Sequence, residues 1–377
     1  MKPLVIHNIH THVFTIHHVP LRFLPFNLVT SFKSQFWNRI IRTLLHWISV
    51  FTKNEQFRHI VVMADAAEHE KQEEILLDMM GFYPSQTRFG LLSMDMDYME
   101  AGPPEQDFLK QLEQLAALKQ KYPEQIVPFM AIDPRRPGLL DLAKKQIELG
   151  FGGFKLYPPL GYYPFDERLD EVYAFAEAEG LPIITHCSPG GIYWRGRITP
   201  EMRIHPKTGE LLKGRNNAEF ARNFSNPANY EYVIEKFPRL KICLAHFGGG
   251  EEWDKYLENH WPPAEVKRRL DGKETRMPIS WFTTIIEMME THQNLYADIA
   301  YTAHQERFLP LIKVLLNTTL REKILYGSDC YMVQLDKSER TFSINVRGYM
   351  GEKDYRQMAE TNPRIFLRRE KAASPQS

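Results

Sequence analysis

Short apolar runs alternate along the chain with longer stretches in which apolar residues recur every three or four positions. Turn residues bound the short runs, as is typical of buried strands, and the longer stretches have the period of amphipathic helices. Strands are predicted at residues 4–10, 88–95, 126–133, 152–158, 182–187, 240–246, 294–300 and 323–329. Helices are predicted at residues 54–80, 105–122, 137–150, 166–180 and 226–237. Gly150 and Gly180 stand where a left-handed residue commonly ends a helix.

Eight strands with interleaved helices predict an α/β fold, a (β/α)₈ TIM barrel that forms a single domain over residues 1–370. A doubly wound open sheet is the main alternative, but it normally has a glycine-rich phosphate turn after an early strand, and the sequence has none. Residues 13–53 and 188–225 are long for loops, so we expect insertions after strands 1 and 5 that form a lid and specificity walls. The tail, residues 371–377, is predicted to be disordered.

Composition narrows the classes of partner. The 377 residues include 47 basic and 47 acidic side chains, so no net charge favours nucleic acid, and a small-molecule substrate is expected. No run reaches the roughly 20 apolar residues of a membrane span. The amphipathic stretch 36–51 fits either a dimer surface or a lid, and a homo-oligomer stays open. Three cysteines without a CxxC pattern and the lack of a secretory leader predict a cytoplasmic protein.

Polar residues end several of the predicted apolar strands. His10 and His12 share one face if residues 4–10 continue as a strand, although two histidines can fall this close by chance. His186, His246 and Asp329 end strands 5, 6 and 8. In a closed barrel these ends converge on one cavity, where unpaired polar groups would be costly. Imidazoles with a carboxylate suit a divalent metal, Zn²⁺ first, with Mn²⁺, Fe²⁺ or Co²⁺ as alternatives.

An ordered set of motifs resembles the amidohydrolase superfamily, in particular its amidohydrolase-related branch of TIM-barrel metal-dependent hydrolases and decarboxylases. The motifs are the HxH of His10 and His12, GGFKLYPP, ITHCSPGG, FPRLKICLAHFGGG and LYGSD. The resemblance implies a metal on His10, His12, His186 and Asp329, with Asp329 also accepting a proton from metal-bound water. It implies that His246 is a further ligand or polarises the scissile bond.

Lys155, in GGFKLYPP, is the ambiguous member of the catalytic set. In some relatives this lysine becomes a carbamate that bridges two metals, whereas in the amidohydrolase-related branch it commonly stays a free amine near the substrate. We expect a single metal and a free amine. The candidate substrate contacts lie beside strand ends or in the long loop and are Tyr157, Trp194, Arg195 and Arg197. For the two arginines a carboxylate on the substrate is a suitable partner, because a guanidinium binds a carboxylate with two hydrogen bonds.

Three functions follow from this pattern. The first is a metal-dependent hydrolase in which Asp329 takes a proton from water and hydroxide attacks an amide, ester or lactone carbonyl. The resemblance also implies a second, non-oxidative decarboxylation of an unsaturated or aromatic acid. The third, a non-catalytic binding barrel, is disfavoured because every expected polar strand end is present.

Overall fold

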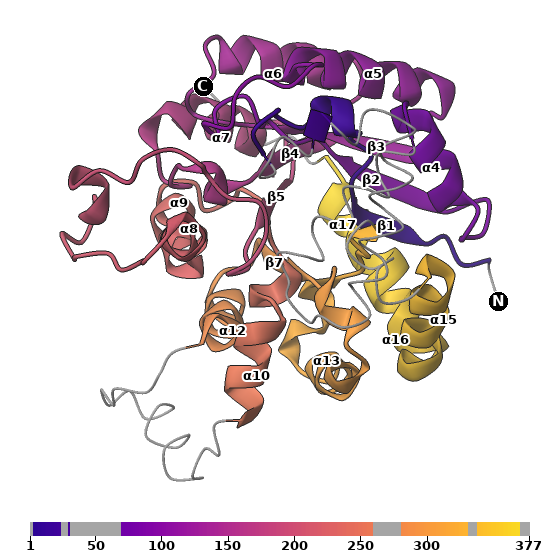
Figure 1. The fold of residues 1–377 in the computed structure, drawn as a ribbon. Helices are drawn as coiled ribbons and strands as arrows, with labels where there is room; N and C mark the ends of the chain where they lie inside the picture. Colours follow the sequence, from indigo (N-terminus) through magenta and orange to yellow (C-terminus); the bar gives the residue numbers. More distant parts are fainter. Residues whose placement is uncertain (1–2, 24–28, 31–68, 259–279, 331–337, 370–377) are drawn as a thin grey trace, which may run out of the picture.

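The computed structural model describes residues 3–23, 29–30, 69–258, 280–330 and 338–369 (Figure 1). The predicted amphipathic stretch 36–51, most of the expected insertion 13–53, the first part of the predicted helix 54–80 and the tail 371–377 lie outside these residues.

Eight parallel strands make one sheet, in which each strand pairs with the next along the chain. The strands are β1 His7–Thr11, β2 Arg88–Leu92, β3 Ile126–Ala131, β4 Gly153–Leu156, β5 Ile183–His186, β6 Ile242–Ala245, β7 Leu295–Asp298 and β8 Ile324–Leu325. Two backbone hydrogen bonds join the ends of the sheet, from Ile9 N to Tyr326 O at 3.1 Å and from Asp329 N to His10 O at 2.9 Å. The eight strands therefore form a nearly closed barrel, as predicted.

Helices surround the barrel on its outer side (Figure 1). Their bounds are α4 Gln72–Met80, α5 Phe108–Lys121, α6 Leu139–Glu148, α7 Asp170–Ala178, α8 Asn217–Ser225, α9 Glu231–Lys236, α10 Gly250–Glu258, α12 Trp281–Thr291, α13 Leu309–Leu315, α15 Glu339–Met350, α16 Glu352–Arg356 and α17 Asn362–Leu367. In α5 the side chain of Asp107 accepts from Lys110 N at the start, and Phe108, Leu112 and Leu115 are buried on one face.

The side chains of each strand alternate between the barrel interior and the helices. Ile184 and Tyr296 belong to a small cluster inside the barrel, whereas Ile183 and Leu295 belong to the large core under the helices. The same alternation places His186 and Asp298, each two residues further along, inside the barrel at the carboxyl ends of β5 and β7. Polar groups therefore gather at that end above an apolar interior.

The segment after β5 differs in part from the expectation of one long loop. Helix α8 begins at Asn217, where the side chain of Asn216 accepts from Glu219 N, so the loop is shorter than residues 188–225. Residues 188–216 hold one turn of 3-10 helix, Glu201–Arg203, and an isolated bridge between Ile204 and Leu211. Gly150 and Gly180 have φ of 96° and 65°, as predicted for residues that end helices. Among the helices that the structure describes, none is long and apolar enough to cross a bilayer.

Candidate metal centre and active site

The barrel brings the predicted strand-end residues into one buried cluster. His10, His246 and Asp329 each offer a ligand atom, and these atoms all lie within 4.8 Å of one another. The His12 ring lies 5.5 Å from the His10 ring, centroid to centroid. His186 adjoins the group through Nδ1, which is 3.2 Å from His246 Nε2. The five side chains are at most 8% exposed.

In each of the four imidazoles, one ring nitrogen faces an oxygen that can only accept a hydrogen bond. Three of these oxygens are backbone carbonyls, and the fourth belongs to the carboxylate of Asp298, which accepts when it is ionised. That nitrogen must then carry the hydrogen, so the other nitrogen of a neutral ring presents a lone pair. The fixed contacts are His10 Nδ1 to Asp298 Oδ2 at 2.9 Å, His12 Nδ1 to Leu92 O at 2.8 Å, His186 Nε2 to Gly190 O at 2.8 Å, and His246 Nδ1 to Ala300 O at 3.1 Å.

The remaining nitrogens fit a cation. The lone pairs of His186 Nδ1 and His246 Nε2 face each other across 3.2 Å, an arrangement that a shared positive charge would stabilise. His10 Nε2 is buried without a hydrogen-bond partner among the described residues. Three imidazoles and the Asp329 carboxylate are a donor set of the kind that holds a divalent metal. Which of His12, His186 and His246 complete that set with His10 and Asp329 stays a prediction.

Burial keeps the imidazoles neutral and therefore able to bind a metal. It lowers the pKa of His10, His12 and His186 well below the usual value, and neighbouring positive groups act in the same direction. The pKa of His246 is lowered to about 4, again mainly by burial. Burial also raises the pKa of Asp329 to about 7, against the opposing charge of Lys155.

Asp298 is a site residue that the sequence analysis missed. This carboxyl is fully buried at the end of β7, where Oδ2 faces His10 Nδ1 and Oδ1 accepts from His246 N at 2.9 Å and Ala300 N at 3.0 Å. Burial raises its pKa, which the facing groups of His246 and Lys155 oppose. The signal was present in the sequence NLYADIA, where an aspartate interrupts an apolar strand as His186 does in PIITHC.

Lys155, on β4, lies close enough to the same cluster for the charges of Asp298 and Asp329 to act on its amine. Its side chain is 0% exposed, and Nζ has no hydrogen-bond partner among the described residues. Burial lowers its pKa to about 8, while the charges of Asp298 and Asp329 oppose that shift. Nζ also lies 5.6 Å from the centroid of the Tyr157 ring. The site thus holds a buried amine that is not hydrogen-bonded within the protein.

The chain adopts uncommon backbone geometry where strands end at the site. His246, Phe247 and Asp329 have φ of 63°, 47° and 55°, a left-handed region that costs non-glycine residues about 1 kcal/mol or more each. Asp329 is held there by its backbone bond to His10 O, and the preceding Ser328 is held by Asn8, whose Nδ2 donates to Ser328 Oγ at 2.8 Å. Such strain is common at functional sites.

The loop after β5 closes over His186. The ring of Tyr157 stacks on His186 at 4.3 Å, and its hydroxyl accepts from Ile192 N at 3.1 Å. Gly191 has φ of 107°, and a Cβ at this position would lie 2.5 Å from the Tyr157 hydroxyl and 2.9 Å from His186 Cε1. Glycine is therefore required for the close approach of this loop to the imidazole.

The other candidate substrate contacts lie further along the same loop. Trp194 is half-buried, and its backbone N donates to Pro159 O at 2.8 Å. Arg195 donates to the Tyr193 hydroxyl at 2.6 Å and to Phe23 O at 3.2 Å. Arg197 is exposed. The structure thus gives Arg195 partners within the protein, and substrate contact by these three residues stays a prediction.

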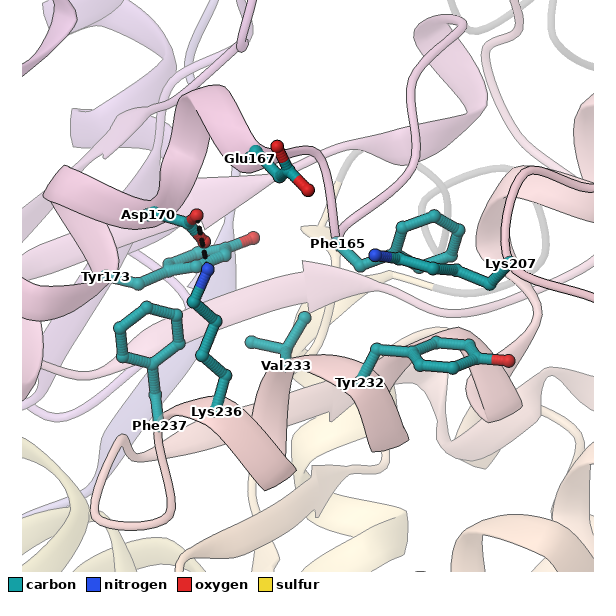
Figure 2. A pocket seen from close by; sticks show the side chains of 9 residues that line it. All are labelled: Phe165, Glu167, Asp170, Tyr173, Lys207, Tyr232, Val233, Lys236 and Phe237. Atoms are coloured by element: carbon teal, nitrogen blue, oxygen red, sulfur yellow. Dashed lines mark hydrogen bonds and ion pairs between the residues drawn. The ribbon is translucent and has the colours of Figure 1, made fainter.

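A separate surface groove lies between α7 and α9 (Figure 2). Lys236 Nζ spans it to Asp170 Oδ2 at 2.6 Å, and Lys207 extends over the ring of Phe165, 5.7 Å from the centroid. No predicted site residue lines this groove, so the strand-end cluster remains the candidate active site.

Comparison with known proteins agrees with the fold. A family model described as amidohydrolase matches residues 9–369. No curated protein sequence matches the chain. Similar solved structures include the 5-carboxyvanillate decarboxylase of Sphingomonas paucimobilis, with 12% identity, a TM-score of 0.55, and coverage of 98% of this chain and 100% of that one.

Two further structures are similar over the same length. The dihydroxybenzoic acid decarboxylase of Polaromonas sp. JS666, solved with bound manganese and the inhibitor 2-nitroresorcinol, has 14% identity, a TM-score of 0.51 and 97% coverage of each chain. A 2,6-dihydroxybenzoate decarboxylase bound to 2,6-dihydroxybenzoate has 15% identity, a TM-score of 0.50, and coverage of 97% of this chain and 99% of that one. At these identities the likeness establishes the barrel fold. Because the family model spans nearly the whole barrel, the chain belongs to the amidohydrolase family.

Proposed function

We propose that the protein is a metal-dependent decarboxylase that removes CO₂ without oxidation from an unsaturated or aromatic carboxylic acid. The observation that carries this choice is the buried amine of Lys155, which has no hydrogen-bond partner among the described residues. A buried ammonium without a partner is costly, and an anionic substrate would supply the missing partner. The three similar structures are each named as a decarboxylase, which supports the same choice.

Charge balance also favours an acid over a neutral carbonyl compound. The imidazoles are neutral, so the charged groups of the site are the Lys155 ammonium and the carboxylates of Asp298 and Asp329. With a divalent ion added and Asp329 ionised, their sum is about +1. A carboxylate substrate reduces this buried charge, whereas a neutral amide, ester or lactone leaves it in place.

In this proposal the residues of the chain bind the acid and move one proton. His10, Asp329 and the neighbouring imidazoles would hold a divalent ion, which would supply Lewis-acid activation of the bound acid. Lys155 donates hydrogen bonds to the same anion. We propose that the Asp329 carboxyl delivers the proton to the carbon that bears the carboxylate, a role that the raised pKa of this buried group favours before a cation binds. The bond from that carbon to the carboxylate then breaks, its electron pair restores the π system, and CO₂ leaves.

The metal itself is proposed to be Zn²⁺ or Mn²⁺. Nitrogen ligands favour Zn²⁺, and the similar structure from Polaromonas was solved with manganese. Hydrolysis of an amide, ester or lactone is the second candidate function, because the Asp329 carboxylate can also accept a proton from water. A binding barrel without chemistry is the third outcome of the test below.

Product analysis separates these functions. The metal-loaded protein is incubated with a panel of unsaturated and aromatic acids labelled with ¹³C in the carboxylate, in D₂O, and with amides, esters and lactones in H₂¹⁸O. We expect release of ¹³CO₂ with one deuterium placed on the carbon that bore the carboxylate, and loss of turnover in Asp329→Asn. Asp107→Asn is the matched control, because this exposed residue caps α5 and Asn caps a helix equally well. Incorporation of ¹⁸O without CO₂ release would replace decarboxylation by hydrolysis. Turnover that persists in Asp329→Asn would refute the role of Asp329.

A further inference from the structure

Asp298 occupies a position from which one side chain contacts three elements of the site. Oδ1 accepts from two backbone N–H groups, those of His246 and Ala300, which follow β6 and β7. Oδ2 faces His10 Nδ1 on β1, and the Cys243 thiol on β6 lies 3.7 Å from the same oxygen. The side chain is 0% exposed, so these contacts are made without competing water.

His10 differs from the other imidazoles in what fixes its hydrogen. His12, His186 and His246 face backbone carbonyls, which no side-chain substitution can remove. His10 alone faces a side chain, that of Asp298, and its opposite nitrogen, Nε2, is the buried atom without a partner. The carboxylate of Asp298 therefore decides which nitrogen of His10 can bind a metal.

We propose that Asp298 is a positioning residue that holds His10 as the Nδ1–H tautomer, with the Nε2 lone pair toward the metal, and thereby sets the metal affinity of the site. The inference rests on the metal site of the proposed function. A carboxylate behind a ligating histidine fixes the ring and raises its basicity, and removal of such a partner typically lowers metal affinity 10- to 100-fold.

Substitution of Asp298 by Asn has a defined consequence. The side-chain oxygen of Asn is expected to stay on the two backbone N–H groups, because the reversed amide would place NH₂ against two donors. The NH₂ group then faces His10 Nδ1, so that nitrogen becomes the acceptor and the hydrogen moves to Nε2. In this tautomer Nε2 cannot bind a metal until it loses its proton.

The first measurement uses the metal-free wild-type protein with ¹⁵N-labelled histidine. Two-bond ¹H–¹⁵N correlation spectra distinguish the two tautomers, and the His10 signals are assigned with His10→Gln. We expect His10 as Nδ1–H. The Nε2–H tautomer in the wild-type protein would overturn the inference, and this result does not require Asp298→Asn to fold.

The second measurement compares Asp298→Asn with a matched variant. Asp133→Asn is the control, because Asp133 is also a buried carboxyl, located beyond β3, but its partner is Arg135, at 2.6 Å, and no histidine of the site. Dissociation constants for Zn²⁺ and Mn²⁺ are measured by chelator competition. We expect Asp298→Asn to show His10 as Nε2–H and at least 10-fold weaker binding of both metals, with Asp133→Asn unchanged.

The inference is wrong if Asp298→Asn keeps both the Nδ1–H tautomer and the wild-type affinity. Neither measurement depends on catalysis. Failure to detect CO₂ would therefore count against the proposed function and leave the tautomer and the affinities to decide the role of Asp298.

Discussion

Substitution of Lys155 by Met should stabilise the metal-free protein while abolishing its activity. Burial lowers the pKa of this amine from 10.5 to about 8, so the folded state binds the lysine proton less tightly than the unfolded state. A shift of this size corresponds to about 3 kcal/mol of lost stability at pH 7. Met has similar length, carries no charge and suits a buried cavity.

That pKa already includes the attraction between the Lys155 ammonium and the carboxylates of Asp298 and Asp329. We therefore expect a net stabilisation of about 3 kcal/mol at pH 7, which for a chain of this length is a rise in Tm of about 4 °C. The difference should shrink as pH rises from 8 to 10.5, because wild-type Lys155 then becomes neutral in both states.

The assay is urea denaturation and thermal melting of metal-free protein at pH 7 and pH 10. Lys241→Met is the matched control, since the Lys241 ammonium donates to Phe366 O at 2.8 Å and Arg368 O at 2.6 Å. Its removal should destabilise the protein by about 1 kcal/mol. If Lys155→Met were destabilised as much as Lys241→Met, burial of the Lys155 ammonium would not be costly, and the argument for an anionic substrate would fail.

Three further predictions follow from the same structure. Gly191→Ala should lower the free energy of unfolding by about 2 kcal/mol or more, because alanine is strained in this backbone conformation and its Cβ would contact His186. The same change should weaken metal binding. An unchanged Tm and an unchanged metal affinity would contradict the close packing of this loop. Burial lowers the pKa values of the His7 and His18 imidazoles to about 4. Stability that is present above pH 6.5 should therefore be lost as the pH falls toward 4, by about 2 kcal/mol for each residue at pH 5. A urea midpoint that does not change between pH 7 and pH 5 would refute this. Asp329→Asn should remove turnover without unfolding the protein, which circular dichroism and product assays check together.

Strand positions were predictable because a buried parallel strand needs a continuous apolar run. Seven of the eight predicted runs contain a whole strand of the structure, and the run 4–10 covers β1 except for Thr11. The strands are shorter than the runs, and β8 has only Ile324 and Leu325. The runs include residues that follow the last paired position, such as His246 and Asp329, whose backbone turns into the left-handed region. A run of apolar residues therefore does not predict at which residue the hydrogen bonds between strands end.

The candidate site was predictable where a polar residue closes an apolar strand. This criterion predicts His186, His246 and Asp329. It also fits Asp298, but the predicted run 294–300 places that residue inside the strand, whereas β7 ends at Asp298. The contacts that fix each imidazole were not predictable, since Leu92 O, Gly190 O and Ala300 O are backbone atoms that any residue provides.

Substrate contacts in the long loop were harder to predict. Arginines such as Arg195 and Arg197 have the same chemistry whether they bind a carboxylate, an aromatic ring or water. Only the fold shows that Arg195 lies over the ring of Tyr193, at 4.0 Å, and that Arg197 is exposed. The sequence could not separate hydrolysis from decarboxylation, because strand-end histidines serve both reactions. The observation that favours decarboxylation, the missing hydrogen-bond partner of Lys155, is visible only in three dimensions.

The central claim is that strand-end imidazoles and Asp329 hold one divalent metal. Elemental mass spectrometry of protein purified without added metal or chelator, with the His10→Ala/His12→Ala variant alongside, tests it most directly. We predict about one equivalent of zinc or manganese in the wild-type protein and its loss in the variant. Two equivalents would indicate a bridging carbamate on Lys155. No metal in the wild-type protein, even after reconstitution with Zn²⁺ and Mn²⁺, would contradict the account.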